Sequence, residues 1–198
     1  MTSTAIPKML NTPSVEETAI VSARARSRAV GALVMSGFAA AWAAYGLMRA
    51  NAAPWAWVAL AAVILAFGVR TLVVLRAHPG VDASLPDDVV AQRRRGDRIL
   101  TWACIGEGVG MLVAVNVAVN LGLPQWQAAA VMAIVGLHFL PLASGLRYPP
   151  HLVSGSALVV WALSYPWLLA AGPMAPAGFL GAAAILLASA AWALRSIR

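Results

Sequence analysis

Six apolar stretches, each long enough to cross a lipid bilayer as a helix, dominate this sequence of 198 residues. A helix needs roughly 20 apolar residues to cross the hydrocarbon core. Only 11% of the residues are charged and 61% are hydrophobic, whereas about a quarter of a soluble domain is charged. We therefore expect an all-α integral membrane bundle of six transmembrane helices. The stretches lie at about residues 29–48, 54–75, 99–121, 127–146, 152–171 and 176–194.

Basic residues alternate between the connections that separate these stretches. They lie in the N-terminal segment, in the long second connection, at Arg147 in the fourth connection and at the C-terminus. The other three connections contain a single arginine, Arg49. Cytoplasmic loops of membrane proteins carry an excess of lysine and arginine. The alternation predicts three hairpins with both termini in the cytoplasm.

The predicted domain organisation is simple. A cytoplasmic segment, residues 1–28, precedes a single six-helix domain, residues 29–198, which contains a cytoplasmic loop at 77–98. The sequence SVEE, from Ser14 to Glu17, resembles a capping box, in which the two side chains satisfy backbone N–H groups at a helix start. We expect a short, partly amphipathic helix there on the cytoplasmic surface, or alternatively a partly ordered tail.

The loop at 77–98 also contains the signals that start a helix. Ser84 can cap a helix, Pro86 suits a first turn, and Asp87 and Asp88 favour the positive end of the helix dipole. Three arginines, Arg93–Arg95, follow at the foot of the third apolar stretch. Their position favours an anchor that sets the membrane orientation over a site for nucleic acid or anionic lipid.

Three ionisable side chains lie inside the apolar stretches, where charge is costly and indicates a functional site. The rise of 1.5 Å per helical residue places Arg70, Glu107 and His138 roughly 9 to 13 Å from the cytoplasmic end. We predict that His138 faces the bundle interior within hydrogen-bonding reach of Glu107, directly or through one water. Arg70 is long enough to neutralise this carboxylate. Alternatively, Arg70 extends to the interface, and His138 only joins two helices.

Four neutral polar residues are candidates for the lining of a pathway: Ser36, Asn116, Asn120 and Ser156. Asn116 and Asn120 are four residues apart and therefore share one helix face, roughly opposite to Glu107. The alternative for the two asparagines is hydrogen bonding between helices, which is common in membranes.

The sequence predicts no metal site and no cofactor. Its one cysteine, Cys104, allows no intrachain disulfide, and no spacing of zinc ligands is present. Walker, G-x-S-x-G, H-E-x-x-H and C-x-x-C motifs are absent. The three histidines, including His78 and His151, lie at different depths, which argues against two haem ligands. No catalytic residue is assigned.

The stretch GLHFLPLA, residues 136–143, and the preceding GEGVG, residues 106–110, resemble a pattern in small bacterial multipass membrane proteins of unknown function. The layout of six helices in three hairpins is similar to that of hairpin-repeat acid-resistance membrane proteins and of urea channels. The resemblance implies a multipass protein of the bacterial inner membrane. It covers only the third and fourth apolar stretches and implies no defined site.

These observations favour a channel or transporter for a small solute or for protons, with Glu107 and His138 as its polar constriction. We expect it to self-associate in the bilayer, and a small molecule is a candidate ligand. A membrane-embedded enzyme is the alternative, with Glu107 as general acid or base and His138 as its partner on a lipophilic substrate. An assembly or sensor subunit is a third hypothesis, in which the loop at 77–98 contacts a partner.

Overall fold

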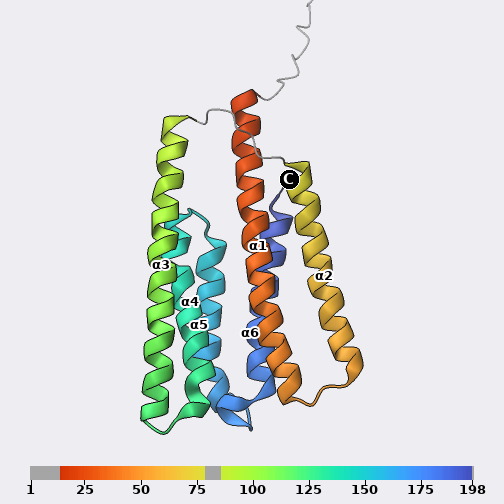
Figure 1. Ribbon diagram of the computed structural model, residues 1–198, viewed down its shortest axis with the longest axis vertical. Helices are drawn as coiled ribbons and strands as arrows, with labels where there is room; N and C mark the ends of the chain where they lie inside the picture. The colour runs from red at the N-terminus through yellow and green to blue at the C-terminus, as the bar shows by residue number, and fades with distance from the viewer. Residues whose placement is uncertain (1–13, 79–85, 198) are drawn as a thin grey trace, which may run out of the picture.

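The computed structural model describes residues 14–78 and 86–197, and within these residues the chain is helical and contains no strand. Six α-helices follow one another, and two short 3-10 turns, η1 (Pro124–Trp126) and η2 (Gly172–Met174), precede the fourth and the sixth (Figure 1). The helices are α1 (Val15–Arg49), α2 (Pro54–Ala77), α3 (Asp87–Asn120), α4 (Gln127–Gly145), α5 (Pro150–Leu168) and α6 (Pro176–Arg195).

Five of the six helices, all except α5, are long and apolar enough to cross a membrane. Helix α5 is as long as α4, but it contains two prolines, a histidine and three serines, which lower its mean hydropathy. The all-helical expectation is therefore confirmed, and the apolar helices place the chain among multipass membrane proteins.

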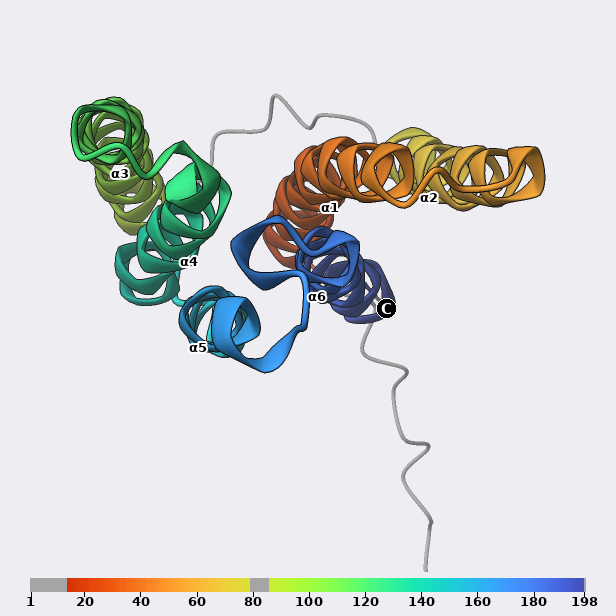
Figure 2. The ribbon, with the colours of Figure 1, turned by 90° about the horizontal axis from the view of Figure 1, so that it is seen from below.

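The helices form a curved row in which the neighbours in space are not always neighbours in the sequence. Seen along the helix axes, the order is α3, α4, α5, α6, α1 and α2 (Figure 2). The most extensive packing joins α1 to α6, which lie far apart in the sequence, and α4 to α5. Helices α2 and α3 flank the row at opposite ends, so each leaves most of its apolar surface exposed (Figure 2).

Small residues allow the central helices to approach closely. On α1, buried residues recur every three or four positions, so they form a continuous seam along one side of the helix. Alanines dominate this seam and the facing side of α6, so the two backbones pack with little side-chain volume between them. Its buried residues on α1 are Ala25, Ala29, Ala32, Ser36, Ala39 and Ala43.

The start of α1 differs from the expected short surface helix, and α3 begins within the expected cytoplasmic loop. The capping box is confirmed, because the Ser14 hydroxyl accepts from the Glu17 N–H at 3.1 Å and Glu17 accepts from the Ser14 N–H at 3.3 Å. However, α1 then continues without a break to Arg49, so the capped turn is the start of the first long helix. Likewise, α3 begins in the expected loop, after Pro86 in the N-cap position, and Ser84 lies outside the described residues.

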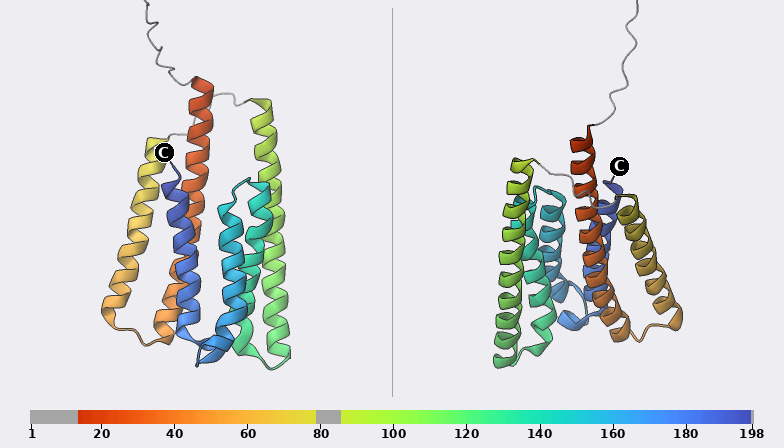
Figure 3. Two further views of the ribbon diagram at one scale, coloured as in Figure 1. Left: turned by 180° about the vertical axis from the view of Figure 1, so that it is seen from behind. Right: turned by 45° about the horizontal axis from the view of Figure 1, so that its top comes forward.

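Both long helices extend beyond the ends of their neighbours on the side where the chain terminus marked C lies (Figures 1 and 3). The first four turns of α1 carry Arg24, Arg26 and Arg28, and those of α3 carry Arg93, Arg94, Arg95 and Arg98. Two arginines of α1 reach neighbouring helix ends. Arg26 donates to the His78 carbonyl at the end of α2, at 3.0 Å, and Arg28 donates to the Ser196 carbonyl at the end of α6, at 2.7 Å. Arg28 also lies 5.5 Å from the centre of the Tyr148 ring.

Candidate functional site

Glu107 of α3 and His138 of α4 meet between the two helices. The Nδ1 atom of His138 lies 3.4 Å from the Oε2 atom of Glu107. Both side chains are largely shielded, with exposed fractions of 10% for His138 and 17% for Glu107. The expected proximity of the two groups is therefore confirmed. Glu107 lies on the side of α3 that faces His138 of α4.

The contact is close, but it is not an aligned hydrogen bond. His138 Nδ1 is buried and has no hydrogen-bond partner among the described residues. A buried polar atom without a partner costs about 1 to 3 kcal/mol. His138 thus keeps one buried nitrogen without a hydrogen bond, 3.4 Å from a carboxylate oxygen, within apolar helices.

Glycines set the spacing of α3 and α4 around this pair. A side chain at Gly110 would meet Ile134 at 3.3 Å, and one at Gly145 would meet Ile99 at 2.6 Å. At Gly145 the Ile99 side chain would have to move to admit a larger residue, whereas at Gly110 the Ile134 side chain would have to yield by only a few tenths of an ångström. By contrast, Gly106 and Gly108, which flank Glu107, have no neighbour within 4 Å. Of the three glycines in residues 106–110, Gly110 lies against α4, and Gly106 and Gly108 face open space.

A third side chain, Cys104, completes a cluster that the sequence analysis did not anticipate. It lies three residues before Glu107 and therefore on the same face of α3. Its Sγ atom, a Glu107 carboxylate oxygen and a His138 ring nitrogen all lie within 4.8 Å of one another. Cys104 is exposed, so the cluster is open on its side. In the sequence, only the C-x-x-E spacing of Cys104 and Glu107 pointed to this cluster. Two possible ligands on one helix do not indicate that a third, His138, comes from another helix.

Arg70 does not belong to this cluster, contrary to expectation. It is exposed on α2, which packs against α1 and α6 at the opposite end of the row from α3 (Figure 2). The error was to infer lateral proximity from depth, because two residues at one level can lie on opposite flanks of a bundle.

The expected lining residues do not surround a common path. Asn116, Asn120 and Ser156 are exposed on the outer surface of the chain. The Asn116 amide donates to the Leu112 carbonyl of its own helix at 2.7 Å, which satisfies it locally. Ser36 is buried in the α1 seam and donates to the Leu33 carbonyl at 2.9 Å. The grouping of these four residues as a pathway is therefore wrong for a single chain.

Aromatic rings connect His138 to a second buried histidine. Phe139 lies 5.8 Å from the His138 ring in an edge arrangement and 5.3 Å from the His151 ring in a stacked arrangement. His151 is buried at the start of α5. Nearby along α5, the Ser154 hydroxyl is hydrogen-bonded to the Ser189 hydroxyl of α6. Polar contacts thus accompany the packing of the helices on both sides of α5.

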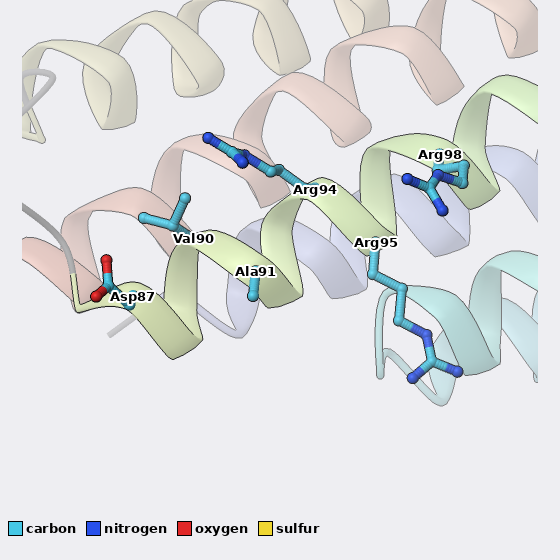
Figure 4. Close-up of a pocket in the computed structure, with 6 residues that line it drawn as sticks. All are labelled: Asp87, Val90, Ala91, Arg94, Arg95 and Arg98. Carbon is cyan, nitrogen blue, oxygen red and sulfur yellow. The ribbon is translucent and has the colours of Figure 1, made fainter.

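Two surface cavities lie away from Glu107 and His138. One, of about 510 Å³, lies along the first turns of α3. The arginines that line this cavity point in different directions from α3, as Figure 4 shows. Their charges are therefore spread around the helix. The cavity is lined by Asp87, Val90, Ala91, Arg94, Arg95 and Arg98. The other, of about 270 Å³, lies at the opposite end of the molecule and includes Trp42, Tyr45 and Phe179.

Comparisons of this chain with protein-family models, with curated proteins and with solved structures find no match.

Proposed function

We propose that this chain is a six-span protein of the bacterial inner membrane that transports a small solute, with Glu107 and His138 at its intramembrane binding site. The observation that carries the proposal is the 3.4 Å contact between these two groups inside otherwise apolar helices. Ionisable groups are rare at such positions and commonly mark the pathway of an ion or solute.

The proposed orientation, with both termini in the cytoplasm, is supported by the distribution of arginine. Ten described arginines lie in the first turns of α1 and α3, at the ends of α2 and α6 and in the α4–α5 turn. These segments share one end of the molecule (Figures 1 and 3). Arg49 is in the last turn of α1, at the other end. The ten are Arg24, Arg26, Arg28, Arg76, Arg93, Arg94, Arg95, Arg98, Arg147 and Arg195.

The sixth span is α5, which is less apolar than the rest. It packs against α4 on one side and α6 on the other, and both of these are long and apolar enough to span. Its polar residues His151 and Ser154 are buried by these neighbours, so their cost in a bilayer is lower than hydropathy implies. We also propose self-association, because α3 buries little of its apolar surface within one chain.

The proposal is tested in proteoliposomes containing the full chain. Uptake of protons, urea and Zn²⁺ is followed with a trapped pH-sensitive dye, by vesicle swelling and with a trapped zinc-sensitive dye, respectively. We expect flux of one of these solutes, reduced at least about tenfold in Glu107→Gln and in His138→Asn. This loss corresponds to about 1.4 kcal/mol or more.

Asn116→Ala is the matched control, because it removes a polar side chain from the exposed face of α3. We expect this variant to retain the flux of the unmodified chain. Absence of all three fluxes, or equal flux in the two site variants and the control, would contradict the proposed function.

A membrane-embedded enzyme is the second candidate, and the open space beside Glu107 favours it. Gly106 and Gly108, which flank Glu107 in the sequence, are exposed, and a side chain at either position would meet no atom within 4 Å. A lipophilic molecule can approach there laterally from the bilayer, with Glu107 as general acid or base. Mass spectrometry of the purified chain would then find a co-purifying lipid that is lost in Gly106→Leu.

A further inference from the structure

We propose that Cys104, Glu107 and His138 bind one divalent transition-metal ion of the zinc type. This inference deepens the proposed function by naming the chemistry of the transported solute, and it rests on that function only for the step from binding to transport.

The geometry of the three side chains suits a metal ion. Cys104 and Glu107 project from one face of α3, and His138 reaches them from α4, so the ligands come from two helices. Zinc–ligand bonds of 2.0 to 2.3 Å imply ligand separations of about 3.3 to 3.8 Å around a tetrahedral centre. The three ligand atoms already lie within 4.8 Å of one another. Small side-chain rotations therefore bring them to bonding distance without moving either helix.

The unsatisfied histidine nitrogen is an independent indication of a ligand. His138 is nine-tenths shielded, and its buried Nδ1 atom faces the Glu107 carboxylate without a hydrogen-bond partner. A neutral imidazole nitrogen with a free lone pair is a common ligand of zinc. A metal ion between the three groups would satisfy this nitrogen and the carboxylate together.

Charge balance favours a metal ion within an apolar environment. A thiolate and a carboxylate carry two negative charges, and a neutral histidine carries none. A divalent cation therefore forms a complex with no net charge, which is the least costly state inside a bilayer. Binding requires the Cys104 thiol to release its proton to water as the metal–sulfur bond forms.

The ligand set selects the class of metal and the kind of site. Sulfur and imidazole ligands suit Zn²⁺, Co²⁺ and related ions, whereas Mg²⁺ and Ca²⁺ prefer oxygen ligands alone. Structural zinc sites commonly have four protein ligands, while three leave a position open for exchange. Cys104 is exposed and Gly106 has no close neighbour, so the open position is accessible.

The test measures metal binding by the full chain, purified in detergent with an affinity tag that contains no histidine. Co²⁺ is the probe, because a cobalt–thiolate bond produces a charge-transfer absorption band. We expect one Co²⁺ per chain, displaced by Zn²⁺ but not by Mg²⁺. Cys104→Ser should abolish the band, and Glu107→Gln and His138→Asn should each weaken binding at least about tenfold.

Controls come from the same types of side chain elsewhere. Asp97→Asn removes an exposed carboxylate from α3, and His78→Gln removes the imidazole at the end of α2. Both should bind Co²⁺ like the unmodified chain. Cys104 is exposed, so its replacement should leave the helix packing intact, and circular dichroism checks the fold of every variant. Absence of Co²⁺ binding, or a band that persists in Cys104→Ser, would overturn the metal site.

The metal site and the transport function can fail separately. Stoichiometric binding of Co²⁺ without Zn²⁺ flux in proteoliposomes supports the metal site and overturns transport of the bound ion. Flux of protons or urea by a chain that binds no Co²⁺ supports transport and overturns the metal site. Binding together with Zn²⁺ flux, both lost in Cys104→Ser, supports both.

Discussion

At the scale of single residues, the closest approach of two backbones in the core depends on a pair of glycines. A side chain at Gly155 of α5 would lie 2.6 Å from the carbonyl oxygen of Gly136 on α4, and one at Gly136 would lie 2.8 Å from that of Gly155. These neighbours are backbone atoms, which cannot rotate away. The two helices must separate to accept any larger residue at either position.

We therefore expect Gly155→Ala to lower the free energy of unfolding by about 1 to 3 kcal/mol, as overpacking does in other cores. Unfolding of the purified chain by denaturant in detergent measures this change. Gly68→Ala, on α2, is the matched control, because a side chain there meets nothing within 4 Å. The control should be neutral or slightly stabilising, since alanine favours helices over glycine. Equal loss in both variants would show that the close contact is not responsible.

At the scale of helices, arginines of α1 stabilise the ends of other helices. The last carbonyl groups of a helix lack partners within the helix and carry partial negative charge. Arg26 and Arg28 donate to such carbonyls after α2 and α6, respectively. The N-terminal basic cluster therefore joins three helices in addition to its proposed role in orientation.

Replacing Arg28 should loosen the end of α6. We expect Arg28→Gln to increase amide hydrogen exchange in residues 192–196 about fivefold or more, because it removes a charged hydrogen bond worth about 1.5 kcal/mol. Mass spectrometry of peptides from the chain in detergent measures the exchange. Arg24→Gln is the control, since Arg24 is exposed one turn earlier on the same helix. Exchange that is unchanged in Arg28→Gln would argue against a capping role.

At the scale of the whole molecule, the row of helices has a basic end and an end that contains one arginine of α1. The number of membrane crossings depends on α5, which is less apolar than the other five helices. If α5 crosses, the turn before it, at Tyr148, and the turn after it, at Ala171, lie on opposite sides of the membrane. The membrane sides of these two turns therefore distinguish a protein with six spans from one with five.

Reporter fusions test the topology directly. An enzyme that is active only outside the cytoplasm should be silent when fused after Tyr148 or after Arg198, and active when fused after Asn51, Gly122 or Ala171. The expectation follows from the alternation of arginine between the turns. Silence after both Tyr148 and Ala171, together with activity after Arg198, would exclude a crossing by α5. Silence after Asn51 and Gly122, together with activity after Tyr148, would reverse the proposed orientation.

The sequence by itself determined the helices and the contacts made within one turn or one short connection. Apolar length predicted six long helices, because a bilayer demands about 20 apolar residues per crossing. The capping box at Ser14 depended only on residues within one helical turn. The depths of Glu107 and His138 followed from the rise per residue, and the short connection between α3 and α4 was sufficient to predict their contact.

Only the tertiary structure decided which helices are neighbours across long distances in the sequence. The packing of α1 against α6 placed α2 on the far flank, and so separated Arg70 from Glu107. The same arrangement turned Asn116 and Ser156 outward. Cys104 joined the site because α4 lies against that face of α3. Local sequence determines which way a residue faces on its own helix, but the partner of that face is set by packing between distant segments.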